Sequence, residues 1–458
     1  MTSENTTTRD NAVVILAAGK GVRMCSDLPK VLHPVAGAPM LHHAMRAALT
    51  LSPTRFAVVV GQGAEAVAAT ARKLVPDAAI CEQAEQLGTA HAMRMAESAL
   101  ADFEGDVFIL YGDTPFISAE TLGAMAAARF AGADLVALGF DAAEPGGYGR
   151  MVTGYGGMLE RIVEAKDASA EEIAIRTCNS GVMAADSTTI FRLLAKVGND
   201  NAKGEYYLTD VVELARAEGL SASVVRCDEA ETLGINDRVQ LAEAEAAFQA
   251  RARRAAMLGG VTMTAPETVF LAWDTKLGRD VKIAPNVVFG PGVEIADGAE
   301  IHAFCHLDAC RIGPSAIIGP FARLRPGSDI GESARIGNFV EIKNADIGHG
   351  AKVNHLSYVG DATIGARANL GAGTVTCNYD GFAKHRTEIG EGAFIGVNTA
   401  LIAPVAIGDN AYVGTGTVIT RDVPDDALAL SRTPQTNREG VAPRLRETLR
   451  SRSKNKNS

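Results

Sequence analysis

The sequence predicts two domains of different architecture: a Rossmann-like α/β domain with a mainly parallel sheet, followed by a parallel β-helix. Three observations lead to this expectation. Short apolar runs alternate with alanine-rich helical stretches in the first half, apolar residues recur at every sixth position in the second half, and a helical segment separates the two patterns. Runs of the first kind are typical of strands buried on both faces of a sheet, and a six-residue period fits neither an α-helix nor a sandwich strand.

The first domain is expected to span residues 1–238. Its strands are predicted at the apolar runs Ala12–Leu16, Ala57–Val60, Val107–Leu110 and Leu135–Leu138. Because the stretches between these runs are helical in character, we expect strands and helices to alternate and the strands to be mainly parallel.

Residues 239–259 are expected to form a linker helix. The segment Val239–Met257 consists mostly of Ala, Glu, Gln and Arg, and it contains neither glycine nor proline. Since those two residues weaken helices most, their absence favours one long helix between the domains.

Residues 260–458 are expected to form the β-helix and a C-terminal tail. The apolar residues with a period of six are Ile312, Ile318, Leu324, Ile330, Ile336 and Ile342, and then Ile389, Ile395, Leu401, Ile407, Val413 and Ile419. A six-residue repeat with glycine at its turns is the signature of a parallel β-helix, in which each repeat forms one side of a coil. The pattern breaks between Thr374 and Arg386, where we expect a loop. The basic segment Arg444 to Lys456 is expected to be a solvated terminus.

Composition excludes several classes of protein. The net charge of −10 argues against a nucleic-acid-binding protein, whose surface would be basic. The apolar stretches are too short for a membrane span, and the first eleven residues lack the apolar core of a signal peptide. The seven cysteines show no CxxC spacing, which favours reduced thiols in a cytoplasmic protein.

The first candidate site begins where a predicted strand runs into a small, glycine-containing turn. Leu16, Ala17, Ala18 and Gly19 allow backbone N–H groups to approach a nucleotide closely, and cations follow in the sequence. The turn is not a dinucleotide fingerprint, because Met24 stands where that motif has its third glycine. It is not a Walker loop either, because the Gly-Lys-Ser/Thr ending is missing.

Further motifs follow in order along the first domain. Tyr111, Gly112 and Asp113 come directly after a predicted strand, where open α/β sheets place their ligands. The other segments are Leu28–Leu32, Gln83–Ala90, Gly147–Arg150, Ile162–Glu164, Cys178–Gly181, Gly204–Asp210 and Gly234–Asn236. Together they closely resemble the family of bifunctional N-acetylglucosamine-1-phosphate uridylyltransferases / glucosamine-1-phosphate N-acetyltransferases, and the resemblance covers nearly the whole chain.

The resemblance implies that a sugar-1-phosphate oxygen attacks the α-phosphorus of UTP and expels pyrophosphate. Asp113 and Asn236 would hold Mg²⁺, a hard cation that prefers oxygen ligands, while Arg23 and Lys30 would stabilise the phosphates. The implied contacts to UDP-N-acetylglucosamine are Leu16, Ala17, Ala18, Gly19, Lys30, Gln83, Gly88, Thr89, Tyr111, Gly112, Asp113, Gly149, Glu164, Asn179 and Asn236.

The second candidate site is a polar cluster on the predicted β-helix, where residues distant in sequence can stack in adjacent coils. The segments Asn354–Tyr358 and Cys377–Gly381 resemble the catalytic stretch and substrate loop of the same family. The resemblance implies that His355 acts as general base on the amine of glucosamine-1-phosphate, which attacks the thioester of acetyl-CoA, and that Glu341 orients the imidazole. It also implies a left-handed β-helix and a homotrimer.

The remaining residues of this second site are also taken from the resemblance. Arg325, Lys343, Tyr358, Asn369 and Lys384 would bind glucosamine-1-phosphate. Asn378 would contact the reacting amine, and the acetyl-CoA site would comprise Asn378, Tyr379, Val397, Thr415 and Arg432.

The sequence departs from the family pattern at two positions, and alternatives remain open. Val397 stands where a serine near the thioester is expected, and Ala90 stands where a glycine is common. The main alternative is a single-function sugar-1-phosphate nucleotidyltransferase whose β-helix only oligomerises, which His355 and the Asn378–Tyr379 loop argue against. An interaction scaffold with a decayed first domain and a hydride-transfer enzyme are weaker alternatives.

Overall fold

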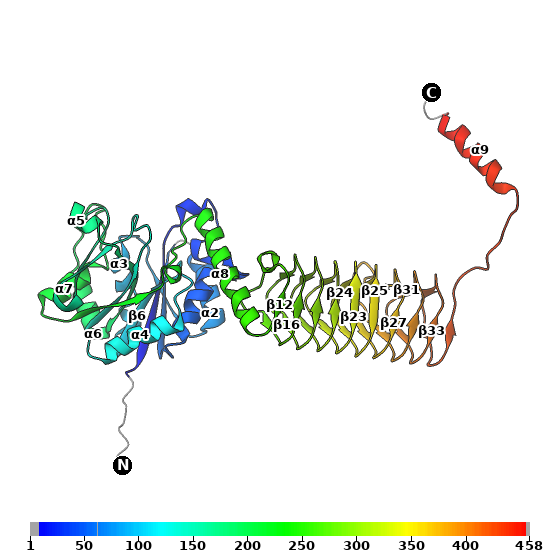
Figure 1. Cartoon of the computed structure of the whole chain (residues 1–458), viewed down its shortest axis with the longest axis horizontal. Helices are drawn as coiled ribbons and strands as arrows, with labels where there is room; N and C mark the ends of the chain where they lie inside the picture. Colours follow the sequence, from blue (N-terminus) through cyan, green and yellow to red (C-terminus); the bar gives the residue numbers. More distant parts are fainter. Residues whose placement is uncertain (1–8, 62, 455–458) are drawn as a thin grey trace, which may run out of the picture. The chain divides into compact units, whose positions relative to one another are not determined.

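The computed structural model of the chain describes residues 9–61 and 63–454. It divides into two compact units (Figure 1). The first unit runs to Arg254 and includes Leu271–Trp273, and the second comprises Ala255–Phe270 and the chain from Asp274 onwards. The division falls inside helix α8 (Arg238–Leu258), the segment expected to be a linker. Among the described residues, no helix is both long and apolar enough to cross a membrane.

The first unit contains a nine-stranded sheet, and its strands confirm the four predicted runs. In spatial order the strands are β11 (Ala222–Cys227), β7 (Leu135–Asp141), β10 (Thr177–Asp186), β6 (Asp106–Tyr111), β1 (Asn11–Ala17), β4 (Arg55–Val60) and β5 (Ala79–Glu82). Strands β8 (Arg150–Thr153) and β9 (Leu159–Val163) extend it from β10, while β2 (Pro34–Val35) and β3 (Ala38–Pro39) form a separate pair. Pairing along this path is parallel except at β10, which runs antiparallel to β6 and β7.

Helices cover both faces of this sheet, as the alternation in β1 requires. Val14 and its neighbours two residues away belong to one apolar cluster, whereas Val13 and Ile15 belong to another. The first cluster includes residues of α3 (Thr89–Arg94), α6 (Ser187–Leu194) and α7 (Asp210–Ala217). The second includes residues of α1 (Met40–Leu49), α2 (Ala64–Leu74) and α4 (Ala119–Phe130). The short helix α5 (Ala170–Ile173) belongs to neither cluster. Because successive residues of a strand point to opposite faces, fully apolar runs are needed here.

Helix α8 is fixed within the first unit by a buried amide. The Gln249 side chain donates to the carbonyl oxygen of Leu271 at 2.7 Å and accepts from its N–H at 2.8 Å. The N–H of Trp273 donates to the carbonyl oxygen of Ala36 at 2.9 Å. These bonds explain why Leu271–Trp273 belongs to the first unit.

The second unit is a parallel β-helix whose coils stack along one axis (Figure 1). One sheet contains β12 (Thr262–Met263), β14 (Lys282–Ile283), β17 (Glu300–Ile301), β20 (Ile317–Ile318), β23 (Arg335–Asn338), β25 (Lys352–His355), β27 (Asn369–Leu370), β30 (Phe394–Ile395), β33 (Tyr412–Val413) and β35 (Leu428–Ala429). The other contains β13 (Lys276–Leu277), β15 (Val288–Phe289), β16 (Glu294–Ile295), β18 (His306–Leu307), β19 (Cys310–Ile312), β21 (Arg323–Leu324), β22 (Ser328–Ile330), β24 (Glu341–Ile347), β26 (Tyr358–Ile364), β28 (Val375–Cys377), β29 (Thr387–Ile389), β31 (Ala400–Ile402), β32 (Val405–Ile407) and β34 (Val418–Ile419).

The six-residue period is confirmed by burial: all twelve of its apolar residues are at most 5% exposed. One other expectation needs correction. The loop expected from Thr374 begins later, because Val375–Cys377 pairs with its neighbours as β28 and continues the coil. The basic tail, expected to be solvated, is exposed over residues 444–452 and forms part of helix α9 (Val441–Lys454), and Lys456 lies outside the described residues.

The interior of the coils generates a prediction about stability. Ile342 is fully buried, so Ile342→Ala leaves a cavity and is expected to lower the unfolding free energy by about 2–5 kcal/mol. Val418 is 48% exposed, so Val418→Ala serves as the control and should cost well under 1 kcal/mol. Urea unfolding followed by circular dichroism measures both. Equal losses for the two variants would contradict a close-packed interior.

Candidate functional sites

A cavity of about 270 Å³ opens at the carboxyl edge of the sheet in the first unit. Its lining brings together predicted residues from β1, from the turn before β2, from the segment after β5 and from the end of β6. These are Leu16, Ala17, Ala18, Gly19, Lys30, Gln83, Gly88, Thr89, Tyr111 and Asp113. Val31, Gln86 and Glu205, which lie in the segments singled out in the sequence but were not named as contacts, also line it, as does Ala92, which lies outside those segments. Carboxyl edges of parallel strands are where such sheets bind ligands.

Glycines at and near this cavity stand where a side chain would collide with neighbouring atoms. A Cβ on Gly88 would lie 2.5 Å from the carbonyl oxygen of Tyr206, and the residue has a φ of 114°. A Cβ on Gly21 would lie 2.6 Å from Cβ of Lys30, so the turn after β1 packs directly against that lysine. A Cβ on Gly112 would lie 3.1 Å from Cγ1 of Val31, so this glycine also packs closely against its neighbour.

Lys30, Asp113 and Asn236 form one polar group at the cavity. The Lys30 ammonium donates to Oδ2 of Asp113 and, at 3.1 Å, to Oδ1 of Asn236. A carboxylate and an amide oxygen therefore converge on a single cation, and this donor set fits Mg²⁺. Among the described residues, no group of three or more acidic, histidine or cysteine side chains is arranged so that it could hold a metal ion. Such a two-oxygen site suits Mg²⁺ held jointly with substrate phosphates and water.

The polar walls of the cavity are held in fixed orientations. The buried amide of Gln83 donates to the carbonyl oxygen of Gly88 at 3.1 Å. The Thr89 hydroxyl accepts from the N–H of Leu208 at 2.9 Å. Burial raises the pKa of Tyr111, which keeps its phenol neutral. These contacts fix the orientations of Gln83 and Thr89 at the cavity wall.

The residues expected to hold the sugar lie together, although they are not among those lining the 270 Å³ cavity. The N–H of Asn179 donates to the carbonyl oxygen of Gly149 at 2.9 Å, and a Cβ on Gly149 would lie 3.6 Å from Oε1 of Glu164. Burial raises the pKa of Glu164, and burial with nearby carboxylates raises that of Asp210 to about 6. Arg23 is exposed on the short helix Val22–Met24 and is not part of the cavity lining.

On the β-helix, the structure brings Lys343, Tyr358, Asn378 and Lys384 into one neighbourhood. A Cβ on Gly360 would lie 2.4 Å from the Tyr358 hydroxyl and 2.9 Å from Nδ2 of Asn378. Contact with the Lys343 ammonium lowers the pKa of Lys384. Two adjacent ammonium groups beside hydrogen-bonding side chains suit a phosphate ester.

The geometry around His355 differs from the expected one. Its Nδ1 lies 2.7 Å from Oδ1 of Asn338, its neighbour in the adjacent coil. Glu341, the expected orienting residue, is instead paired with Arg325 at 2.9 Å and with Arg323 at 3.9 Å. A guanidinium group attracts the carboxylate more strongly than an exposed imidazole does. The 17-residue separation of Asn338 and His355 is the signal that could have identified Asn338.

The residues expected to bind acetyl-CoA follow one another along the coils. The N–H of Gly416, next to Thr415, donates to the carbonyl oxygen of Val397 at 2.8 Å. Arg432 donates to the carbonyl oxygen of Thr415 at 2.5 Å. Tyr379 is exposed on the loop after β28. Its hydroxyl donates a hydrogen bond to the carbonyl oxygen of Gly381 at 2.6 Å. Asn369 lies on the other sheet, in register with Lys352 and Phe394, so one chain does not bring it to Lys343.

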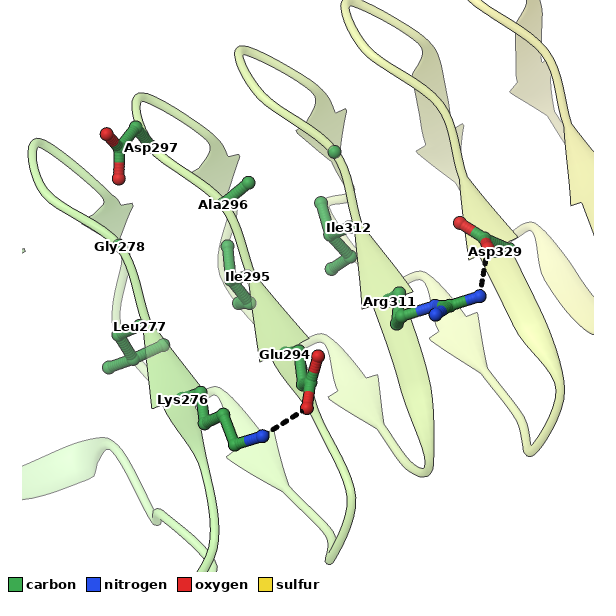
Figure 2. A pocket seen from close by; sticks show the side chains of 11 residues that line it. Lys276, Leu277, Gly278, Glu294, Ile295, Ala296, Asp297, Arg311, Ile312 and Asp329 are labelled. Carbon is green, nitrogen blue, oxygen red and sulfur yellow. Dashed lines mark hydrogen bonds and ion pairs between the residues drawn. The ribbon is translucent and has the colours of Figure 1, made fainter.

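A larger hollow of about 560 Å³ lies on one side of the β-helix and contains none of the predicted site residues (Figure 2). Its charges are paired between coils: Lys276 with Glu294 at 2.5 Å, and Arg311 with Asp329 at 2.8 Å (Figure 2). Such exposed ion pairs contribute little to stability. The remaining carboxylate of the lining, Asp297, lies 3.8 Å from the guanidinium of Arg279. We therefore place the candidate sites elsewhere.

Comparisons with known proteins match both units. Residues 13–184 match the family described as MobA-like NTP transferase domain, and residues 274–309, 309–344 and 386–421 match bacterial transferase hexapeptide (six repeats). The chain is 60% identical over 441 residues to the bifunctional protein GlmU of Ruegeria sp. (strain TM1040), covering 96% of this chain and 98% of that protein. Identity, aligned length and both coverages have the same values for the bifunctional protein GlmU of Dinoroseobacter shibae.

The glycine at the cavity wall generates a second prediction. In Gly88→Ala, the added methyl group collides with backbone, so we expect UTP affinity to fall at least about tenfold. Gly132 has a similar φ of 103°, but a Cβ there meets nothing within 4 Å. Gly132→Ala therefore carries only the backbone strain and should bind UTP normally. Isothermal titration compares them, and equal affinities would show that the wall at Gly88 is not part of the nucleotide site.

Proposed function

The chain belongs to the family of the bifunctional protein GlmU, and we propose how its two sites carry out the two reactions of that family. One reaction transfers acetyl from acetyl-CoA to glucosamine-1-phosphate, and the other transfers uridylyl from UTP to N-acetylglucosamine-1-phosphate with release of pyrophosphate. The product is UDP-N-acetylglucosamine. The observation that carries the proposal is that each unit holds its own group of polar residues, one suited to a nucleotide and one to a phosphorylated amine.

For acetyl transfer, we propose that His355 removes a proton from the amine of glucosamine-1-phosphate. The amine nitrogen then forms a bond to the thioester carbonyl carbon, the carbon–sulfur bond breaks, and coenzyme A leaves as its thiol after taking up the proton. The 2.7 Å contact with Asn338 supports a positioning role for that residue, because it fixes one ring nitrogen and leaves the other for the amine. Lys343 and Lys384 would bind the phosphate, assisted by Arg325.

For uridylyl transfer, we propose that the cavity at the sheet edge holds the nucleotide. Its small residues admit the phosphates close to backbone, and Lys30 neutralises charge as pyrophosphate leaves. Asp113 and Asn236 would hold Mg²⁺, which neutralises phosphate charge when bound. Gln83 and Thr89 would contact the uracil, while Gly149, Glu164 and Asn179 would contact the sugar. Arg23 would act from its exposed position on the ligand's phosphates.

We propose a homotrimer, the assembly that the resemblance implies, and an exposed aromatic column supports association of copies. Phe304, Phe321 and Phe339 stack at one corner of successive coils, with ring centroids 4.9 and 5.1 Å apart. They are 53%, 45% and 55% exposed, so a contiguous apolar strip faces outwards. Association would also allow Asn369 to complete the Lys343 group of a neighbouring copy.

We also propose the cytoplasm as the compartment. All seven cysteines are free thiols, and burial raises the pKa of several of them, including Cys305 to about 11 and Cys310 to about 12. Unpaired, protonated thiols fit a reducing environment.

The experiment that tests the function supplies glucosamine-1-phosphate, acetyl-CoA, UTP and Mg²⁺, and follows free thiol and pyrophosphate separately. We expect both to be released. Pyrophosphate formed only from ready-made N-acetylglucosamine-1-phosphate, with no thiol at any stage, would instead support the single-function alternative.

A pair of variants tests whether the two reactions are independent. Asp113→Ala removes a charge beside Lys30 and is expected to lower uridylyl transfer at least about a hundredfold while acetyl transfer continues. His355→Ala is expected to have the opposite pattern, with acetyl transfer reduced at least about a hundredfold. Each variant is the other's control. Loss of both reactions in a folded variant would contradict independence, and an unchanged acetylation rate would exclude His355 as the base.

A further inference from the structure

Three polar side chains form a column at one corner of consecutive coils, each 17 residues after the last. Asn344 donates from Nδ2 to Oδ1 of Asp361 at 2.7 Å, and Asn378 donates from Nδ2 to Oδ2 of the same carboxylate. Asp361 and Asn378 are only 8% and 7% exposed. The carboxylate therefore lies between two amides and receives one hydrogen bond from each.

The carboxylate determines which way both amides face. An ionised carboxylate only accepts hydrogen bonds, whereas the two ends of an asparagine amide have nearly the same shape and opposite polarity. Burial raises the pKa of Asp361, but the hydrogen bonds from Asn344 and Asn378 and the charges of Lys343 and Lys384 outweigh burial and lower it overall. Asp361 is thus ionised near neutral pH. Asn378 must present its NH₂ group to it and direct Oδ1 away.

The surroundings of Asn378 make this orientation relevant to the reaction. Its Nδ2 and the Tyr358 hydroxyl both lie against Gly360, and Lys343 approaches Oδ2 of Asp361 at 4.0 Å. The amide is therefore among the side chains proposed to hold glucosamine-1-phosphate. A nucleophilic amine has one N–H for the base, a lone pair for the carbonyl carbon and one N–H that needs an acceptor.

We propose that Asp361 is a positioning residue that fixes the amide of Asn378 so that Oδ1 accepts a hydrogen bond from the substrate amine. The inference rests on the proposed acetyl transfer and adds a residue to it. Asp361 does not touch the reacting atoms. It acts through Asn378, by excluding the reversed amide that would present NH₂ to the amine and repel its N–H.

Asp361→Asn tests the orientation directly. Asp361 has a φ of 49°, a conformation that asparagine also tolerates, so the backbone should be preserved. The introduced amide has one accepting oxygen and cannot accept from both neighbours, so it no longer forces Asn378 to face it with NH₂ and the reversed amide of Asn378 becomes accessible. We expect kcat for acetyl transfer to fall about tenfold, while the rate of uridylyl transfer remains unchanged.

The double variant Asp361→Asn with Asn378→Asp separates orientation from a structural role. The introduced amide then accepts from Asn344 and donates to the introduced carboxylate, whose second oxygen faces the amine. Net charge is unchanged, and we expect kcat to recover to at least about threefold above that of Asp361→Asn. Asn378→Asp alone places the introduced carboxylate against the carboxylate of Asp361. Its rate of acetyl transfer should therefore be lower than that of the double variant. If both folded Asp361 variants are equally slow, the orienting role is wrong.

The control is Asp280→Asn, which makes the same substitution at an exposed residue with a similar φ of 59°. It should acetylate at the wild-type rate, and thermal unfolding of every variant verifies folding. Absence of thiol release from the wild type would refute the proposed acetyl transfer itself. Wild-type acetylation with an equally fast Asp361→Asn variant would overturn only the role of Asp361.

Discussion

The stacking of one coil directly on the next is the constraint on which the second unit depends. The sides of the coils contribute buried apolar residues, and the repeating ones pair in register with their equivalents in the next coil, as Ile318 does with Ile336. Buried contacts and backbone hydrogen bonds therefore both require a fixed coil length. Because that length is fixed, residues about 17 or 18 positions apart must meet. The polar contacts of the second site follow from the same register that packs the interior.

The first unit reaches its site by a different route. Its strands are held by apolar contacts on both faces, and their carboxyl ends carry the functional residues in the loops that follow. Small residues leave the cavity open, and Lys30 is held between Asp113 and Asn236. Positions far apart in sequence meet because parallel strands end at one edge. The sheet supplies rigidity and the loops supply chemistry.

Sequence patterns predicted most of the fold because burial dictates them. The period of six in the β-helix and the apolar runs of the sheet each have one structural solution. The antiparallel direction of β10 is not written in such a pattern, because a fully buried strand looks the same in either direction. The site was predictable where a motif is contiguous, as at Tyr111–Asp113. The site was not predictable where a side chain has several possible partners. Glu341 was expected to orient His355, but it pairs with Arg325, and Asn338 contacts His355 instead.

The same coil register that forms the second site also imposes an electrostatic cost there. It brings Lys343 and Lys384 close enough that the pKa of Lys384 is lowered, which means that their ammonium groups repel. Asp361 reduces this repulsion, because its buried carboxylate lies 4.0 Å from the Lys343 ammonium. The two hydrogen bonds that it accepts hold the carboxylate in place. It neutralises only one of the two charges. The remaining positive charge is held in place by the fold before any ligand arrives, so the phosphate ester proposed to bind here would relieve repulsion and would not have to assemble its site.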